Sequence, residues 1–99
     1  MHTIELFELA VHVAELAGYH VRHEYLGGQG GGVCEFGGRR WVFIDLALNT
    51  VEQLEQLCTA FADMPELTRE QIPQSLHPWM TTPVPSHPAS ESSRTHRAA

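Results

Sequence analysis

The N-terminal part of the chain has the apolar periodicity of an amphipathic helix. The polar side chains of residues 3–17 share one narrow sector of the helical wheel: Glu5, Glu8, His12 and Glu15. All other positions there except Thr3 are apolar, a stripe wider than one packing surface normally requires. Thr3 suits the N-cap, and Gly18 suits the left-handed residue that ends a helix. We therefore predict a helix over residues 3–17 with its acidic stripe in water.

Three short runs with strand-like composition follow this helix: residues 19–26, 33–36 and 40–46. Gly37-Gly38 separates the second run from the third, which predicts a tight hairpin turn because both turn positions can require a positive φ. In the third run Trp41 and Val42 face opposite sides, and both sides are apolar. That composition is typical of a strand that is buried on both faces.

A second amphipathic helix is predicted from Thr50 to about Asp63. Thr50 and Gln53 match the capping-box pattern, and Met64-Pro65 ends the helix. A short turn is predicted at residues 68–71. Five of the six prolines lie at or beyond Pro73, and the sequence from His77 is rich in Pro, Ser and His.

The predicted fold is a two-layer α+β domain of the order α-β-β-β-α, in which a three-stranded antiparallel meander packs against two helices. Residues 1–76 form this single domain, and residues 77–99 form a flexible, disordered tail whose beginning can dock onto the body through Trp79 and Met80. Deletion of residues 82–99 is expected to leave thermal stability nearly unchanged. A sheet of three strands with apolar residues on both faces is most simply completed by a second copy, so we expect a homodimer.

Composition narrows the classes of function. The chain has 12 acidic and 6 basic residues, all six of them Arg, for a net charge of -6. The absence of Lys excludes Schiff-base chemistry and a Walker lysine, and the acidic body argues against nucleic-acid binding.

The N-terminus lacks the positive region of a signal peptide, and glutamates interrupt the apolar stretches, so we expect a cytoplasmic protein without a membrane span. Its two cysteines are expected to be free.

The glycine-rich loop Gly27–Gly32 holds five glycines in six residues. One interpretation is an anion site built from successive backbone N–H groups, with Arg39 and Arg40 supplying positive charge. The ligand-binding candidates are then Gly28, Gly30, Gly31, Gly32, Arg39 and Arg40. The interpretation that we favour is instead a flexible hairpin connection, or glycines that let another backbone or subunit approach closely.

Cys34 follows this loop at the start of the second predicted strand. We expect the first two strands to pair across the loop, which makes His20, Arg22 and His23 candidate activators of a Cys34 nucleophile. The catalytic candidates are therefore Cys34, His20 and His23, although a structural thiol is the favoured interpretation. Cys58 is expected in the core.

A metal site is not expected. His20 and His23 lie three residues apart on a strand and so face opposite sides, and no CxxC pair is present.

The element order also matches the core of restriction-endonuclease-like nucleases, which need (D/E)xK on the third strand to hold Mg²⁺. Here Asp45 is followed by Leu46 and Ala47, so only a degenerate relative is compatible with the sequence.

One resemblance rests on the glycine loop and three segments beyond it. The segment Gly27–Cys34, the Gly-centred hairpin, residues 42–46 and residues 52–56 together resemble a group of small bacterial proteins with no assigned activity. The resemblance covers roughly residues 4–65. It implies no activity, cofactor or site residue.

Three functions are compatible with these features, with no cofactor expected for any of them. The first is a homodimeric interaction or ligand-binding module that uses the open sheet face and the glycine loop. The second is an enzyme or redox protein that depends on Cys34, with the loop as an anion cradle. The third is a degenerate nuclease-like fold without catalysis. We favour the first, which is not an enzyme.

Overall fold

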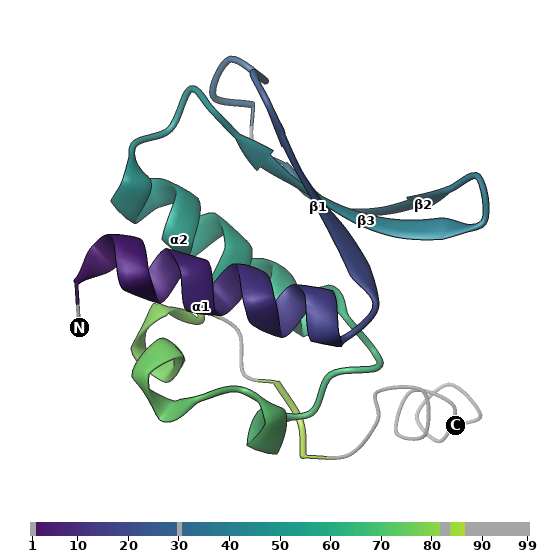
Figure 1. Ribbon diagram of the computed structural model, residues 1–99, viewed down its shortest axis with the longest axis vertical. Helices are drawn as coiled ribbons and strands as arrows, with labels where there is room; N and C mark the ends of the chain where they lie inside the picture. The colour runs from purple at the N-terminus through teal and green to yellow at the C-terminus, as the bar shows by residue number, and fades with distance from the viewer. Residues whose placement is uncertain (1, 30, 82–83, 87–99) are drawn as a thin grey trace, which may run out of the picture.

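The computed structural model describes residues 2–29, 31–81 and 84–86, and it has the α+β composition expected from the sequence (Figure 1). Its helices and strands are, in chain order, α1 (Thr3–Leu16), β1 (Tyr19–Glu24), β2 (Gly32–Phe36), β3 (Arg39–Asp45) and α2 (Thr50–Ala60). Three short 3-10 helices follow: η1 (Phe61–Asp63), η2 (Arg69–Gln71) and η3 (Gln74–Trp79). Within the described ranges, no helix is both long and apolar enough to cross a membrane.

The sheet is mixed, and the predicted antiparallel meander is wrong. Its strand order is β1-β3-β2, with β1 parallel and β2 antiparallel to the central strand β3. The β2–β3 hairpin forms as predicted, with φ of 61° at Gly37 and 74° at Gly38. The connection from β1 to β2 reverses the direction of the chain, but it does not join neighbouring strands, because it crosses the end of β3. Seven residues are enough for that, since two strand spacings are only about 10 Å.

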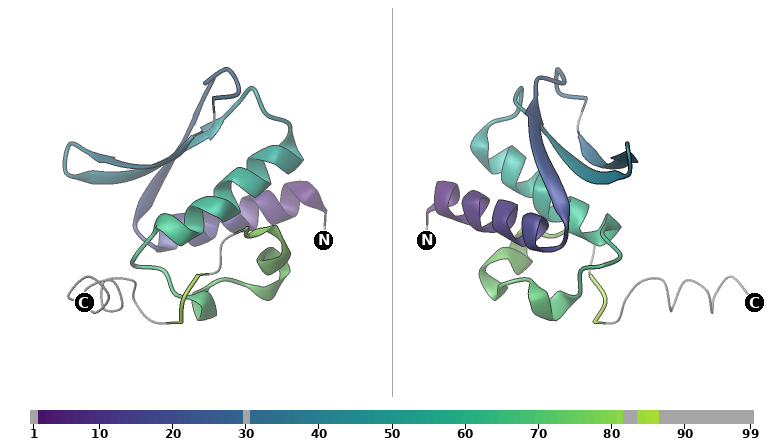
Figure 2. Two further views of the ribbon diagram at one scale, coloured as in Figure 1. Left: turned by 180° about the vertical axis from the view of Figure 1, so that it is seen from behind. Right: turned by 45° about the vertical axis from the view of Figure 1, so that its right-hand side comes forward.

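Both long helices cover the same face of the sheet (Figure 2). The face toward them contributes Val42 and Ile44, which are fully buried, and α2 contributes Leu54 and Leu57. Phe61 of η1 is also fully buried against this cluster. The opposite face of the sheet, called here the outer face, carries His20, Arg22, Cys34, Phe36, Trp41 and Phe43, as the register of the strands requires.

The helix caps differ from those predicted by one position. His2 rather than Thr3 precedes α1, and its backbone N–H donates to Glu5 at 2.9 Å. Asn49 rather than Thr50 caps α2: its side chain accepts from the Glu52 N–H, and the Glu52 side chain accepts from the Asn49 N–H. The acidic side chains one turn into each helix therefore close the capping boxes.

The chain continues to pack on the body beyond residue 76. The predicted boundary falls inside η3, and Trp79 and Met80 pack against the core as expected. Val84 is only 2% exposed, and the Arg69 N–H donates to the carbonyl of Pro85 at 3.0 Å. The body of the protein therefore extends at least to residue 86, and deletion of residues 82–99 should lower thermal stability rather than leave it unchanged, because it removes Val84 from the core. The remainder of the predicted tail, residues 87–99, lies outside the described residues.

Truncation of the Val84 side chain measures this docking. Val84→Ala should lower the free energy of unfolding by about 1–2 kcal/mol, because it removes buried apolar area and leaves a small void. The midpoint of thermal unfolding should fall by several degrees, while Ser75→Ala, at an exposed position of η3, should leave it unchanged. Equal midpoints for the two variants would show that residues 84–86 do not contribute to the core.

Candidate functional site

The glycine-rich loop wraps around a carboxylate that belongs to the chain itself. Asp45 ends β3 and is fully buried. Its Oδ1 accepts from the N–H groups of Leu26 and Ala47, each at 2.9 Å, and its Oδ2 accepts from the Gly28 N–H at 2.8 Å. Several convergent N–H donors are the chemistry expected of an anion cradle, and the donors on Leu26 and Gly28 are engaged by Asp45.

Helix α2 fixes the same corner from the other side. The Asp45 backbone N–H donates to Oε1 of Gln56 at 2.9 Å, and the Leu46 N–H donates to the Glu24 carbonyl at 2.8 Å. The end of β3 is thus attached to β1, to the loop and to α2 at once. From the sequence, Asp45 is considered only as a possible residue of a nuclease motif. The sequence signal for its structural role, as an acceptor of backbone N–H groups, is an acidic residue at the end of a buried strand in a chain that also has a glycine-rich loop.

Gly31 explains part of the glycine content of the loop. A Cβ at this position would lie 1.9 Å from the carbonyl oxygen of Phe43 and 3.3 Å from Nε2 of Gln56. The backbone of residue 31 therefore passes so close to β3 that no side chain fits there. This is the close approach of another backbone that the favoured interpretation of the loop included, whereas its other form, a hairpin connection, is wrong because β1 and β2 are not neighbours. Gly30 lies outside the described residues.

The two arginines proposed as partners of the loop lie at the other end of the hairpin. Gly32 pairs with Phe43, whereas Arg39 pairs with Phe36 at the turn. Four residues along a strand separate these pairs by about 13 Å. Arg40 is instead engaged by Glu66, with Nη1 and Oε2 3.0 Å apart. The described structure thus does not bring Arg39 and Arg40 to the glycine loop.

The thiol of Cys34 and the imidazole of His20 share a row across the outer face, but they are not neighbours. The predicted pairing of the first two strands is wrong, because β3 lies between them. Cys34 and His20 each pair with Trp41, from opposite sides. Their Cα atoms are therefore about 10 Å apart with an indole between them. His23 pairs with Ile44, on the face toward the helices, where its ring contacts Phe7 of α1 edge-on at 5.9 Å.

Trp41 is the centre of a row of rings on the outer face. Its ring centroid lies 5.0 Å from that of His20 on β1 and 5.5 Å from that of Phe36 on β2, the latter nearly parallel at 12°. Phe43 adds a fourth ring at 6.3 Å. His20 and Phe36 are exposed, the latter by 54%. Of the described buried side-chain polar atoms, Trp41 Nε1 has no hydrogen-bond partner. The outer face therefore presents a stacked aromatic surface to its surroundings.

A polar network connects the face of the sheet toward the helices with the segment that follows α2. The Tyr19 hydroxyl donates to Oε1 of Glu66 at 2.8 Å, and Glu66 is also the ion-pair partner of Arg40. Burial, together with the hydrogen bond to Glu66, raises the pKa of the Tyr19 phenol well above its ordinary value. No sequence pattern indicates this contact, because it joins residues 47 positions apart.

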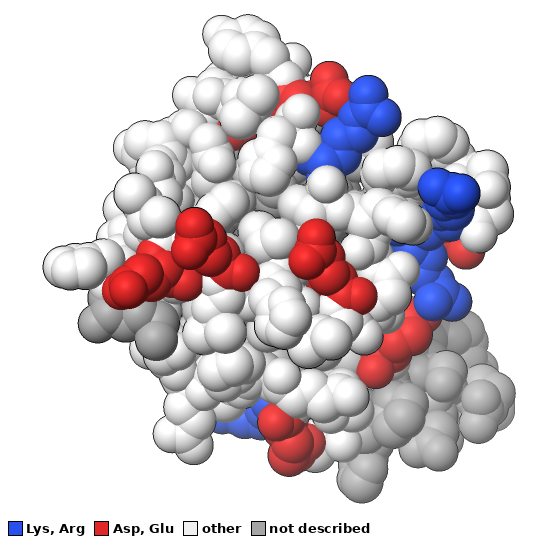
Figure 3. Space-filling view, viewed as in Figure 1, with Lys and Arg blue, Asp and Glu red and all other residues white. Residues whose placement is uncertain are grey.

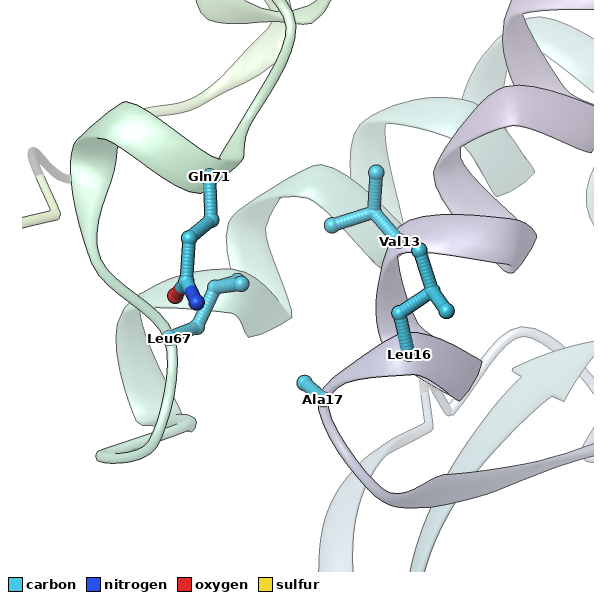
Figure 4. Close-up of a pocket in the computed structure, with 5 residues that line it drawn as sticks. All are labelled: Val13, Leu16, Ala17, Leu67 and Gln71. Carbon is cyan, nitrogen blue, oxygen red and sulfur yellow. The ribbon is translucent and has the colours of Figure 1, made fainter.

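An apolar groove of about 280 Å³ lies between the end of α1 and the segment that leads to η2. Figure 4 shows its lining: Val13, Leu16, Ala17, Leu67 and Gln71. Leu16 at its rim is 75% exposed, which accounts for part of the excess width of the apolar stripe on α1. The groove offers one amide and otherwise only carbon, so it lacks the convergent polar groups of a reactive site.

Charge is distributed unevenly over the surface. Acidic side chains of α1 cross the middle of the view in Figure 3, while the basic groups lie toward its margins. Glu5, Glu8 and Glu15 are all exposed, as the helical wheel predicts. Among the described residues, no group of three or more His, Cys, Asp or Glu side chains is placed to hold a metal ion.

Comparison with known proteins adds no relative: no family model, no curated protein and no solved structure matches the chain. The resemblance drawn from the glycine loop therefore stays a prediction that rests on the residues quoted for it.

Replacement of Asp45 tests the carboxylate at the loop. Asp45→Asn should lower the free energy of unfolding by about 3 kcal/mol, because the amide directs N–H donors at backbone N–H groups and leaves them unpaired. Urea unfolding measures this loss, and amide exchange at Leu26 and Gly28 should accelerate. Asp63→Asn, an exposed acid on η1, is the control and should change neither. An Asp45→Asn protein of unchanged stability would contradict this role.

The phenol of Tyr19 should make the protein sensitive to alkali. The unfolded chain releases this proton near pH 10 while the folded protein retains it, so the stability that depends on the Tyr19 pKa is complete below pH 10 and declines above it. Between pH 10 and 12 the free energy of unfolding should fall less steeply for Tyr19→Phe than for the unaltered protein. Tyr25→Phe, at a residue 75% exposed, should follow the unaltered protein. Identical slopes for all three would refute the assignment.

Proposed function

We propose that the protein is a small homodimeric interaction module in which two copies meet through the three-stranded sheet. The observation that carries the proposal is the row of stacked rings around Trp41 on the outer face. Stacked aromatic groups at a protein surface are typical of contact sites, because they gain much from leaving water at little cost in side-chain entropy. The two long helices cover the other face, and within the described residues no helix covers the outer face (Figure 2).

Charge favours a second copy as the occupant of this surface. The outer face carries little net charge, since Arg22 is ion-paired with Glu24 and Arg39 lies at the hairpin turn. Two copies that approach through α1 would instead place its three exposed glutamates against the same three, which is unfavourable. In a chain whose net charge is -6, self-association through the sheet therefore meets less electrostatic repulsion than association through α1.

The glycine loop has a supporting role in this proposal. With Asp45 at its centre, it holds the ends of β1 and β3 at a fixed spacing and so keeps His20 and Trp41 in one row. Rigid elements give a more precise contact surface than loops do, which reduces the entropy lost on association.

Native mass spectrometry and sedimentation measurements over about 1–200 µM test the proposal. They should show a species of twice the 11.1 kDa chain mass, in a reversible and concentration-dependent equilibrium. Phe36→Asp should raise the dissociation constant about tenfold or more, since it replaces an exposed ring of the contact surface with a charge.

Ile4→Asp is the matched control. Ile4 is 63% exposed, comparable to Phe36, but it lies on α1 away from the sheet. Its replacement should leave the dissociation constant unchanged. A monomer at every concentration would overturn the proposal, and so would a dimer that Ile4→Asp weakens and Phe36→Asp does not.

A further inference from the structure

We infer that the two copies join edge to edge along β2, antiparallel, about a two-fold axis that passes beside Cys34. This inference rests on the proposed homodimer and specifies its geometry. The occupant of the β2 edge is then the same strand of a second copy, which extends the sheet from three strands to six. A two-fold axis normal to the sheet pairs two identical strands antiparallel with their outer faces on the same side. Phe36, the ring of the row that lies on β2, then enters the contact, and the two rows of rings lie on one face of the six-stranded sheet.

The outer edge of β2 is open. Beyond its pairing with β3, β2 makes no backbone hydrogen bond within the described part of the chain. Its last three residues, Cys34, Glu35 and Phe36, are all exposed. A hollow of about 370 Å³ borders this edge on the side toward the helices, between Val33 and Pro65. Backbone N–H and C=O groups in this state form a template for a further strand.

The other edge of the sheet is better protected. β1 exposes Arg22, which forms an ion pair with Glu24 at the end of the strand, and it also carries His20 and His23. Charged side chains on an edge strand oppose pairing with another chain, because pairing would remove them from water. β2 has a single charged residue, Glu35, and neither Lys, Arg nor Pro. Of the two edges, β2 is therefore the one suited to pairing.

The register follows from the side chains of β2. With the axis at Cys34, Phe36 lies opposite the partner's Gly32, and Val33 lies opposite the partner's Glu35. A Cβ at Gly32 would meet nothing within 4 Å, so no other atom of the described chain crowds this position. An aromatic side chain across from a glycine is a favourable cross-strand pair. An axis at Glu35 would instead place two carboxylates directly opposite each other, which is destabilising.

The inferred geometry places the two Cys34 side chains in contact. Directly opposed residues of antiparallel strands have Cα atoms about 4.5–5.5 Å apart, which is within the range that a disulfide spans. The second cysteine does not compete, because Cys58 is buried and burial raises the pKa of its thiol to about 12.

Opposite charges at position 34 test the register. Cys34→Lys and Cys34→Glu each place like charges at the axis, so each variant alone should dimerise about tenfold more weakly than the unaltered protein. An equimolar mixture should form the mixed dimer with an affinity restored to within a few-fold. Gln74→Lys and Gln74→Glu, at an exposed position of η3, form the control pair and should show no preference for mixing.

Disulfide formation tests the contact directly. Oxidised glutathione should convert two Cys34 thiols into one interchain disulfide and release two molecules of reduced glutathione, which balances the reaction. The product should have twice the chain mass less two hydrogens. Cys58→Ser should retain this product, and Cys34→Ser should abolish it while leaving the noncovalent dimer.

The outcomes separate this inference from the proposed function. A dimer weakened by Phe36→Asp that shows neither charge rescue nor the Cys34 disulfide would overturn the edge geometry and leave the homodimer standing. A monomer under all conditions would overturn both. Charge rescue together with the disulfide supports both.

Discussion

The buried carboxylate of Asp45 is the interaction on which the rest of this structure depends. It ends the central strand, accepts hydrogen bonds from the backbone N–H groups of Leu26, Gly28 and Ala47, and its own backbone N–H donates to Gln56 of α2. Removing a charge from water is costly unless such donors replace the water. Because residue 31 is a glycine, the backbone of the loop can pass directly against β3 without a clash. The glycine content of the loop, which suggests a ligand site, is therefore explained in part by the contact between the loop and Asp45 within the chain.

This anchored loop determines where the chemistry-bearing side chains lie. By carrying the chain across the end of β3, it places β1 and β2 at opposite edges of the sheet. Cys34 and His20 are then separated by Trp41, which forms ring contacts with His20 and with Phe36, instead of forming a pair. The same topology leaves a nearly uncharged edge strand on one side and an ion-paired edge strand on the other. The central position of β3 argues against a catalytic pair of Cys34 and His20, and the same position creates the row of rings that favours a contact surface.

The sequence predicted the local elements well and the long-range arrangement poorly. Both helices, the three strands and the Gly37-Gly38 turn follow from periodicity and turn chemistry, which depend on neighbouring residues. The order of strands depends on where a glycine loop goes, and glycine permits both a turn and a crossing. The burial of Val84 and the bond from Tyr19 to Glu66 join distant residues, so no local pattern indicates them. The opposite faces of His20 and His23 were predictable, because they need only the alternation of a strand.

The central position of β3 has a consequence for synthesis of the chain. Of the three described strands, β1 is synthesised first, yet its partner in the described sheet is the last of them, since Tyr19 pairs with Arg40. The β2–β3 hairpin closes through a two-residue turn and can form as soon as its own residues emerge, whereas β1 must wait for the whole of it. The glycine loop cannot close before the final residue of β3, because that residue carries the carboxylate that the loop surrounds. In a nascent chain β1 therefore has no partner within this sheet until residues 40–45 have been synthesised, and Asp45 completes both the β1–β3 pairing and the loop.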